Sequence, residues 1–299
     1  MPYGMRVNVS KGSAIRPRAS RVRKPKLGQH FLRDEGAARR IVESLGEISQ
    51  RTVLEIGPGT GALTGLLLRK ARRLIAIELD KVLAAQLRMK FATASNIEVI
   101  EGDVLSIDFD TIFGPKPGTS RPGLEWRPEP VDLVGNLPYF ITSDILLRLF
   151  DYRRYFRQMV IMVQREVAER IAAEPGTRDY GLLSATAQLY TRVEALFTLA
   201  PGAFEPPPKV HSAVLRLTVA PQLQELGVDE GKFLRFLKAS FGQKRKTLWN
   251  NLKSQYNPDH LRAALAESGV TPNVRAEALS LQKTAALFRA LQTRDGASG

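Results

Sequence analysis

The chain has 299 residues, of which 43% are hydrophobic and 7% aromatic, enough for one sizeable core and a smaller appended domain. It has no cysteine and only three histidines, which excludes disulfides, zinc ribbons and a cysteine nucleophile. No apolar run is long enough for a membrane span, and no secretory signal begins the chain. We therefore expect a soluble, cytoplasmic, monomeric protein without a membrane partner.

Charge points to a polyanionic partner. The 44 Lys and Arg residues exceed the 30 Asp and Glu residues, giving a net charge of +14. The excess is clustered, because residues 1–30 carry eight basic residues and residues 231–258 carry seven, with no acidic residue in either stretch. A solvated surface is the plain alternative for each stretch. An organellar transit peptide is disfavoured by Pro2, Pro17 and Pro25 and by the lack of an amphipathic period.

The predicted elements indicate an α/β fold with a doubly wound, Rossmann-like sheet. We expect residues 1–25 to form a basic extension, residues 26–219 the sheet domain and residues 220–299 a small, all-helical domain. Helix-like runs such as 62–72 and 81–91 supply the crossovers that parallel strands need. The expected strands are 52–56, 74–78, 97–100, 131–135 and 159–164.

Two further segments complete this organisation. Residues 113–131 are rich in Pro and Gly, so they are expected to form a surface loop before the fourth strand. After Thr218 the apolar spacing becomes helical, with large apolar residues recurring every three or four positions up to Leu252. This spacing predicts the helical domain.

The first strand runs into a glycine-rich turn, VLEIGPGTGALT at 53–64. Gly57 and Gly59 allow positive φ and close approach of a ligand, and Glu55 lies at the strand end, where it can accept hydrogen bonds. The turn also satisfies the dinucleotide pattern, so a nicotinamide enzyme and a plain tight turn stay open at this point.

Acidic residues end the next two strands. Glu78 follows the first glycine by about twenty residues, where a carboxylate can accept hydrogen bonds from both ribose hydroxyls. Asp103 could accept a hydrogen bond from an adenine amino group while Val104 packs against the ring. Each acid alone could be a solvated strand end, but ligands bind at this edge of the sheet.

The fourth strand ends in Gly-Asn-Leu-Pro-Tyr-Phe at 135–140, a segment for which a dehydrogenase has no use. The side-chain oxygen of Asn136 and a backbone carbonyl, expected to be that of Leu137, can accept hydrogen bonds from one amino group. Pro138 fixes the bend, and Tyr139 offers a flat face for a purine. The plain alternative is a proline turn with a core tyrosine.

This segment suits methyl transfer to an adenine amine. The lone pair of that amine is delocalised into the ring, so the nitrogen is a poor nucleophile. Two acceptors aimed at its hydrogens favour a pyramidal nitrogen and stabilise the developing positive charge. A sulfonium donor is already activated, so alignment suffices and no metal is needed.

With these motifs in place, the chain resembles the family of small-subunit ribosomal RNA adenine dimethyltransferases, the kasugamycin-sensitivity methyltransferases. The resemblance runs from Lys26 to about Leu291 and includes the glycine turn and the Asn136 segment. Its other motifs are LGQHFL at 27–32, IELD at 77–80, QREVAERI at 164–171, DYGLLS at 179–184, PGAFEPPPKVHSAV at 201–214 and FGQKRKTLWNNL at 241–252.

The resemblance implies S-adenosylmethionine as the donor and two adjacent adenines in a hairpin near the 3′ end of small-subunit ribosomal RNA, within a pre-30S-type particle, as the target. It adds Gln29, His30 and Leu32 to the donor site, alongside Gly57, Glu78, Asp103 and Asn136. It implies that Phe204 faces the target base opposite Tyr139, and that a basic helix with Lys244, Arg245 and Lys246 grips phosphates. The N-terminal extension and the Pro-rich insert exceed the family's short forms.

Two other functions stay open. One is methylation of large-subunit RNA, as in the antibiotic-resistance relatives, although the motif at 241–252 favours the small-subunit enzyme by resemblance. The other is a non-catalytic RNA-binding assembly factor. The intact Glu78, Asn136 and Tyr139 favour catalysis.

Overall fold

The structure is a computed structural model that describes residues 30–115 and 128–296. The expected basic extension 1–25, Gln29 and most of the Pro-rich insert lie outside the described residues. Within the described part, no helix is long and apolar enough to cross a membrane.

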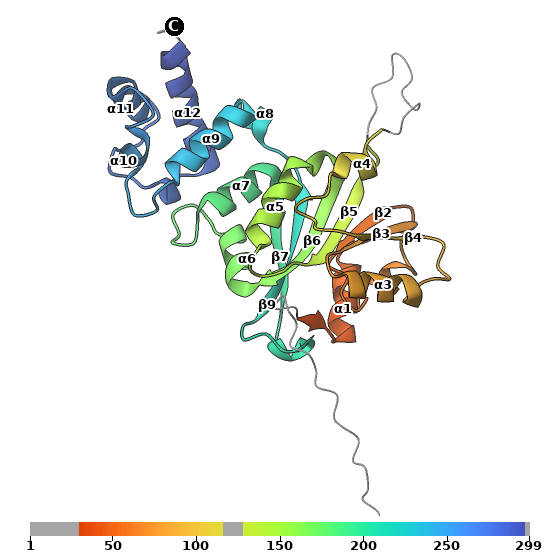
Figure 1. Cartoon of the computed structure of the whole chain (residues 1–299). Helices are drawn as coiled ribbons and strands as arrows, with labels where there is room; N and C mark the ends of the chain where they lie inside the picture. The colour runs from red at the N-terminus through yellow and green to blue at the C-terminus, as the bar shows by residue number, and fades with distance from the viewer. Residues whose placement is uncertain (1–29, 116–127, 297–299) are drawn as a thin grey trace, which may run out of the picture.

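A seven-stranded sheet forms the centre of the molecule (Figure 1). Its first five strands in spatial order are parallel, and the sixth is antiparallel to both of its neighbours. All five strands predicted from the sequence are present, whereas the antiparallel pair was not predicted. The spatial order is β4 (Ile97–Glu101), β3 (Arg73–Glu78), β2 (Thr52–Ile56), β5 (Val131–Asn136), β6 (Phe156–Gln164), β9 (Ser212–Val219) and β7 (Thr191–Leu199).

Helices cover both faces of the sheet, which confirms the doubly wound prediction. Alternate strand residues point to opposite faces, so Leu54 and Leu133 join one hydrophobic cluster while Val53 and Val134 join the other. The first cluster includes residues of α4 (Phe109–Phe113), α5 (Thr142–Asp151), α6 (Arg165–Ala172) and α7 (Leu182–Tyr190), and the second those of α1 (Glu35–Glu43) and α2 (Thr64–Leu67).

Capping side chains set where several of these helices begin. Asp34 accepts a hydrogen bond from the backbone N–H of Ala37 at the start of α1, and Asp80 caps α3 (Lys81–Lys90) in the same way. The expected helix over 62–72 is shorter than predicted, because only α2 is regular. Leu63 provides no side-chain cap, and Gly65 lies within the helix.

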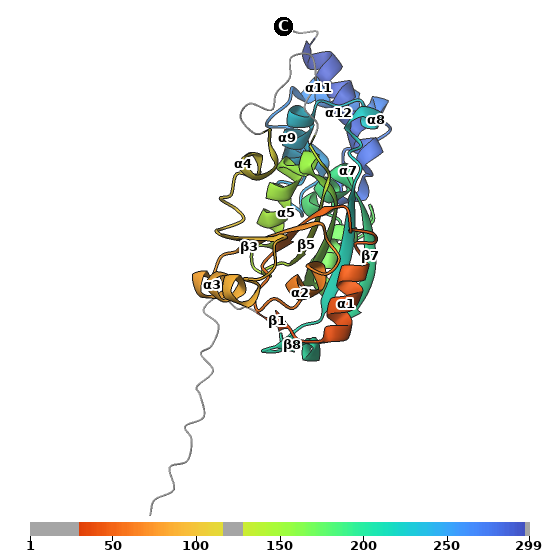
Figure 2. The ribbon, with the colours of Figure 1, turned by 90° about the vertical axis from the view of Figure 1, so that its right-hand side faces the viewer.

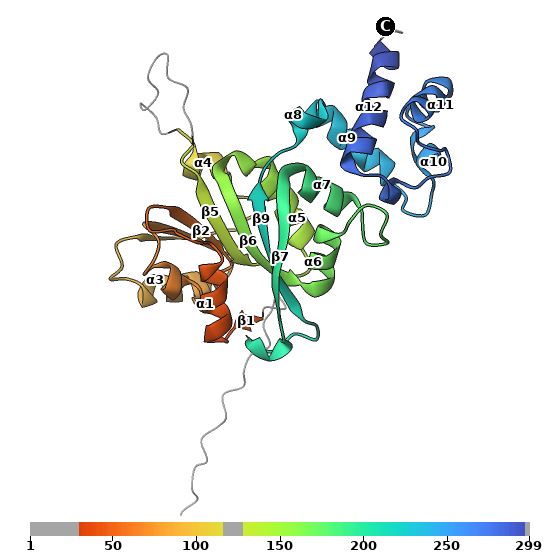
Figure 3. The same ribbon diagram turned by 180° about the vertical axis from the view of Figure 1, so that it is seen from behind.

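The C-terminal region is helical, as predicted, and lies beside α7 at one end of the sheet (Figure 3). Its aromatic core, with Phe233 and Phe236, belongs to the same cluster as Phe150 and Tyr190 of the sheet region. It comprises α8 (Leu223–Leu226), α9 (Glu230–Ser240), α10 (Leu248–Leu252), α11 (Pro258–Glu267), the short 3₁₀ turn η3 (Ala276–Ala278) and α12 (Leu281–Gly296). Two further 3₁₀ turns, η1 (Arg153–Tyr155) and η2 (Pro201–Ala203), lie in the sheet region.

Polar contacts also join the helical region to the sheet region. Glu230, the first residue of α9, forms an ion pair with Arg153 at 2.6 Å and accepts a hydrogen bond from the Tyr190 hydroxyl at 2.8 Å. The expected boundary near residue 220 therefore separates two kinds of secondary structure that share one continuous core.

Candidate functional site: a cleft at the carboxyl edge of the sheet

The main cleft lies where the chain changes direction across the sheet. From β2 the chain adds β3 and β4 on one side, and it then returns to add β5 and β6 on the other. Loops at the carboxyl ends of strands separate at such a switch point, which leaves room for a ligand. Residues that follow β2, β3, β4 and β5 line this cleft together, as is usual for a small-molecule site at a switch point.

The structure brings most of the predicted site residues to this one cleft, although they come from five separate stretches of the chain. Those that line it are His30, Gly57, Gly59, Glu78, Asp103, Val104, Asn136, Leu137, Pro138 and Tyr139. Their placement agrees with the expected site, while their individual roles stay predictions.

The glycine turn forms one wall of the cleft, and its shape requires glycine. Gly57 and Gly59 have φ values of +67° and +57°. A Cβ at Gly57 would lie 3.3 Å from the carbonyl oxygen of Asn136, and one at Gly59 would lie 2.8 Å from Cδ1 of Phe31. The turn can therefore lie this close to Asn136 and Phe31 only because neither glycine has a side chain.

Two carboxylates at neighbouring strand ends are held by backbone N–H groups. Glu78 is buried; its Oε2 accepts a hydrogen bond from Gly59 at 3.0 Å, and its Oε1 accepts one from Asp80 at 2.9 Å. Oδ1 of Asp103 accepts a hydrogen bond from Leu105 at 2.9 Å. These contacts fix the directions of both carboxylates, which is what a site for a polar ligand needs.

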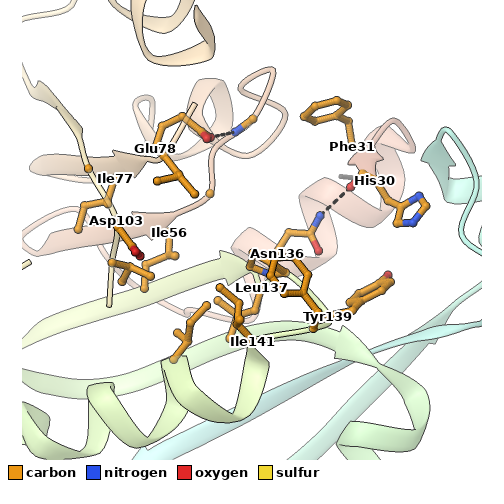
Figure 4. Close-up of a pocket in the computed structure, with 18 residues that line it drawn as sticks. His30, Phe31, Ile56, Ile77, Glu78, Asp103, Asn136, Leu137, Tyr139 and Ile141 are labelled. Atoms are coloured by element: carbon orange, nitrogen blue, oxygen red, sulfur yellow. Dashed lines mark hydrogen bonds between the residues drawn. The ribbon is translucent and has the colours of Figure 1, made fainter. Parts of the chain in front are cut away.

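The amide of Asn136 is oriented by the chain segment that precedes α1. Its Nδ2 donates to the backbone oxygen of His30 at 2.9 Å (Figure 4). An amide has one donor nitrogen and one acceptor oxygen, and a carbonyl oxygen can only accept. The bond to His30 therefore identifies the nitrogen and the oxygen of the Asn136 amide. With the nitrogen engaged in this way, the acceptor oxygen is the other polar atom of a side chain that lines the cleft.

Tyr139 is held from two directions. Its hydroxyl lies 2.6 Å from Oγ of Ser212, a fully buried residue at the start of β9. Burial raises the pKa of the Tyr139 hydroxyl despite the opposing effect of this hydrogen bond, so the phenol stays protonated at neutral pH. The imidazole of His30 stacks on the Tyr139 ring with centroids 5.8 Å apart, and its Nδ1 donates to the carbonyl oxygen of Pro206 at 2.7 Å.

Glu55 and Leu32 lie beside the main cleft and not in it. They line a smaller adjoining pocket, which shares Gly57, Gly59 and Asn136 with the cleft. Glu55 is 1% exposed and accepts a hydrogen bond from the Thr64 hydroxyl at 2.7 Å. Strand alternation places it on the face covered by α2, and this burial raises its pKa to about 7.

Phe204, which was expected to face the target base opposite Tyr139, is not among the residues that line the cleft in this structure. Phe204 is 3% exposed, pairs with Leu32 between β8 (Phe204–Glu205) and β1 (Phe31–Leu32), and packs in the cluster beneath α1. The ring next to Tyr139 is His30 instead. This two-stranded sheet lies at the opposite end of the molecule from the helical region (Figure 2).

The basic triplet Lys244–Lys246 lies in a turn and not on the expected helix. Helix α9 ends at Ser240, and Thr247 begins α10 by accepting a hydrogen bond from Asn250. All three side chains are exposed. Nζ of Lys244 donates to the carbonyl oxygen of Arg178, in the loop between α6 and α7, at 2.7 Å.

Sequence reasoning missed several apolar lining residues. Phe31, Leu79, Phe140 and Ile141 all line the cleft. Phe31, Leu79 and Phe140 are direct neighbours of predicted site residues, and Ile141 is two positions from Tyr139, which was the available signal. Among the described residues, no group of three or more His, Asp and Glu side chains is arranged to hold a metal ion.

A comparison with family models decides the assignment. The model described as ribosomal RNA adenine dimethylase matches residues 21–293. The chain belongs to this family. The match agrees with the resemblance found in the sequence and removes the dehydrogenase alternative.

Curated relatives agree with this assignment. A protein from Koribacter versatilis named ribosomal RNA small subunit methyltransferase A is 55% identical over 90% of this chain and 95% of its own length. A protein of the same name from Geobacter sulfurreducens is 39% identical over 96% of this chain and 99% of its own length.

Solved structures share the fold. A dimethyladenosine transferase from Plasmodium falciparum superposes with a TM-score of 0.70 at 24% identity, covering 89% of this chain and 98% of the other. The 23S rRNA methyltransferase ErmE gives a TM-score of 0.63 at 27% identity, covering 88% and 99%. Both matches extend over the sheet and into the helical region.

Proposed function

We propose that this chain transfers methyl groups from S-adenosylmethionine to the exocyclic amines of two adjacent adenines in a hairpin near the 3′ end of small-subunit ribosomal RNA. The observation that carries the proposal is the orientation of Asn136. Its amide nitrogen is bonded to His30, so its oxygen is the atom available to a substrate amine, in the same cleft as the glycine turn.

The residues on the β2 and β3 side of the cleft fit the methyl donor. Gly57 and Gly59 line the cleft without side chains, so their backbone can approach its methionine end, next to the smaller pocket lined by Leu32 and Glu55. Glu78 has the position to accept hydrogen bonds from ribose hydroxyls, and Asp103 with Val104 has the position to bind an adenine ring. When bound, S-adenosylmethionine supplies a methyl group that is already activated by its sulfonium.

The residues on the β5 side fit the target base. The Asn136 oxygen and the Leu137 carbonyl accept hydrogen bonds from the adenine amine, which favours attack by its nitrogen lone pair. Pro138 shapes this bend, and Tyr139, braced by Ser212, provides the stacking surface. Alignment is the main contribution of the protein. The proton that the amine releases after attack passes to water.

Sequence similarity favours the small subunit over the large one as the substrate. The relatives named for small-subunit methylation reach 55% identity, against 27% for the 23S methyltransferase. The exposed triplet Lys244–Lys246 is suited to phosphate contacts that position the RNA. We further propose that the protein acts as a cytoplasmic monomer on a pre-30S-type particle.

Replacing Asn136 tests the proposed chemistry. We expect Asn136→Ala to abolish methyl transfer to RNA while RNA binding stays largely intact, because the amine loses its acceptor. Asn136→Asp, which keeps an acceptor oxygen but loses the donor to His30, should retain partial activity. The measurements are incorporation of labelled methyl groups and RNA affinity. Wild-type incorporation by Asn136→Ala would contradict the role, and RNA binding without incorporation by the wild type would favour a non-catalytic assembly factor.

A further inference from the structure

Phe140 is unusual among the aromatic residues of this molecule. Its side chain is 69% exposed, whereas every other Phe, Tyr and Trp in the described ranges 30–115 and 128–296 is buried or half-buried. An exposed phenylalanine keeps apolar surface in contact with water, which is unfavourable unless a partner covers it. Phe140 is also a lining residue of the main cleft, so this exposed ring is at the rim of the proposed active site.

The sheet order indicates which half of the cleft Phe140 belongs to. The strand order β3-β2-β5 places the two ligand-binding sides on opposite flanks of β2. Leu79, the other exposed apolar residue of the cleft, follows β3 on the side proposed for the methyl donor. Phe140 follows β5 and comes directly after Tyr139, on the side proposed for the target base.

A base that enters this cleft leaves its neighbours in the RNA without a stacking partner. A target adenine must leave its stack to reach Asn136, and unstacking is unfavourable. The base of the adjacent nucleotide then lies at the rim of the cleft, with one face open to water. An exposed flat ring at that rim can cover this face.

We propose that Phe140 is a stacking platform for the nucleobase that flanks the target adenine. This inference rests on the proposed function and extends it to a second nucleotide. Stacking tolerates any base because every base has a π-face, so the same platform serves whichever flanking base is present as each of two adjacent adenines enters the cleft. The residue thereby offsets part of the cost of unstacking the target.

The test uses the full chain and undermethylated small-subunit RNA hairpins in which 2-aminopurine replaces the base on either side of the target. Phe140→Leu keeps an apolar side chain but removes the flat ring, whereas Phe140→Trp keeps a ring. Because the residue is exposed, both variants should fold, and thermal unfolding checks this. Met89→Leu, at an apolar position that is 80% exposed and not among the cleft-lining residues, is the matched control.

We expect wild type, Phe140→Trp and Met89→Leu to quench 2-aminopurine fluorescence at one flanking position. Phe140→Leu should lose this quenching and at least about fivefold in kcat/KM for RNA, with unchanged donor affinity. Wild-type kcat/KM and quenching in Phe140→Leu would overturn the inference, as would equal losses in the Leu and Trp variants. A wild-type protein that methylates no RNA would overturn the proposed function itself.

Discussion

At the residue scale, the catalytic segment is organised by partners far away in the sequence. Asn136 is oriented by the backbone of His30, and Tyr139 by the hydroxyl of Ser212. The segment itself could be predicted because its residues are consecutive and chemically distinctive. Its partners could not, since contacts over 73 to 106 positions depend on the tertiary fold. The position of Phe204 could not be predicted for the same reason, because nothing in the neighbouring sequence indicates that it is buried beneath α1.

Ser212 provides a prediction for the positioning of Tyr139. We expect Ser212→Ala to lower kcat/KM for RNA about three- to tenfold, because the buried phenol loses its partner, while donor affinity stays unchanged. In a Tyr139→Phe background the same substitution should have no further effect. Thr191→Val, which removes a buried hydroxyl bonded to Ala187 at 2.7 Å, is the control for stability alone. A comparable loss in the Tyr139→Phe background would contradict the positioning role.

Glu55 provides a prediction for the pH dependence of stability. Burial, the largest cause, raises its pKa in the folded protein from 4.5 to about 7. The folded state therefore binds more protons than the unfolded state between pH 4.5 and 7, and stability falls as pH rises through this window.

A variant that cannot ionise at position 55 should show how much the ionisation of Glu55 changes the free energy of unfolding. Glu55→Gln keeps an acceptor for Thr64 but cannot ionise, so the free energy of unfolding of the wild type should fall relative to the variant between pH 5 and pH 8. The expected relative loss is on the order of 2–3 kcal/mol. Urea unfolding of both proteins at several pH values measures it, and parallel profiles would show that Glu55 ionises normally.

At the element scale, the parallel strands were predictable because both of their faces are covered, which makes them continuous apolar runs. Strands β7 and β9 were missed. Strand β7 lies at the edge of the sheet, and only its first and last residues, Thr191 and Leu199, are buried. The residues between them are exposed or half-buried, so the apolar pattern of β7 is weak. Helix α2 was predicted too long because apolar spacing does not reveal a missing cap.

The turn between α9 and α10 was predicted as helix because apolar residues on both sides of it, Phe241 and Leu248, fit a helical spacing and because the family resemblance implied a basic helix. Glycine at 242 and the Thr247 cap end one helix and begin the next. The correction changes the geometry of the proposed RNA contact, because a turn presents the three cations together at a surface. Lys244 also ties this turn to the α6–α7 loop.

The turn therefore has a measurable electrostatic signature. Replacing Lys244, Arg245 and Lys246 together by Gln should weaken RNA binding and lower the slope of log affinity against log salt by about 2 to 3. Donor affinity should not change. Replacing Arg39, Arg69 and Lys70 by Gln removes the same charge from exposed positions on α1 and after α2 as a control. An unchanged salt slope in the first variant would remove the turn from the RNA surface.

At the scale of the whole molecule, the shared core and the Glu230 contacts hold the helical region against α5 and α7. Figure 2 shows this region at one end of the molecule and the β1–β8 pair, next to the cleft, at the other. An RNA that touches both the cleft and the basic turn must extend along the sheet region. This arrangement favours a folded hairpin over a single nucleotide as the substrate.

Mapping methylated nucleotides tests the central claim most directly. The full chain is incubated with labelled S-adenosylmethionine and small ribosomal subunits that lack adenine dimethylation, and the modified positions are then identified in the RNA. The account predicts dimethylated amines on two adjacent adenines in a hairpin near the 3′ end of the small-subunit RNA. No label in that RNA, or label confined to the large-subunit RNA in a parallel incubation, would contradict it.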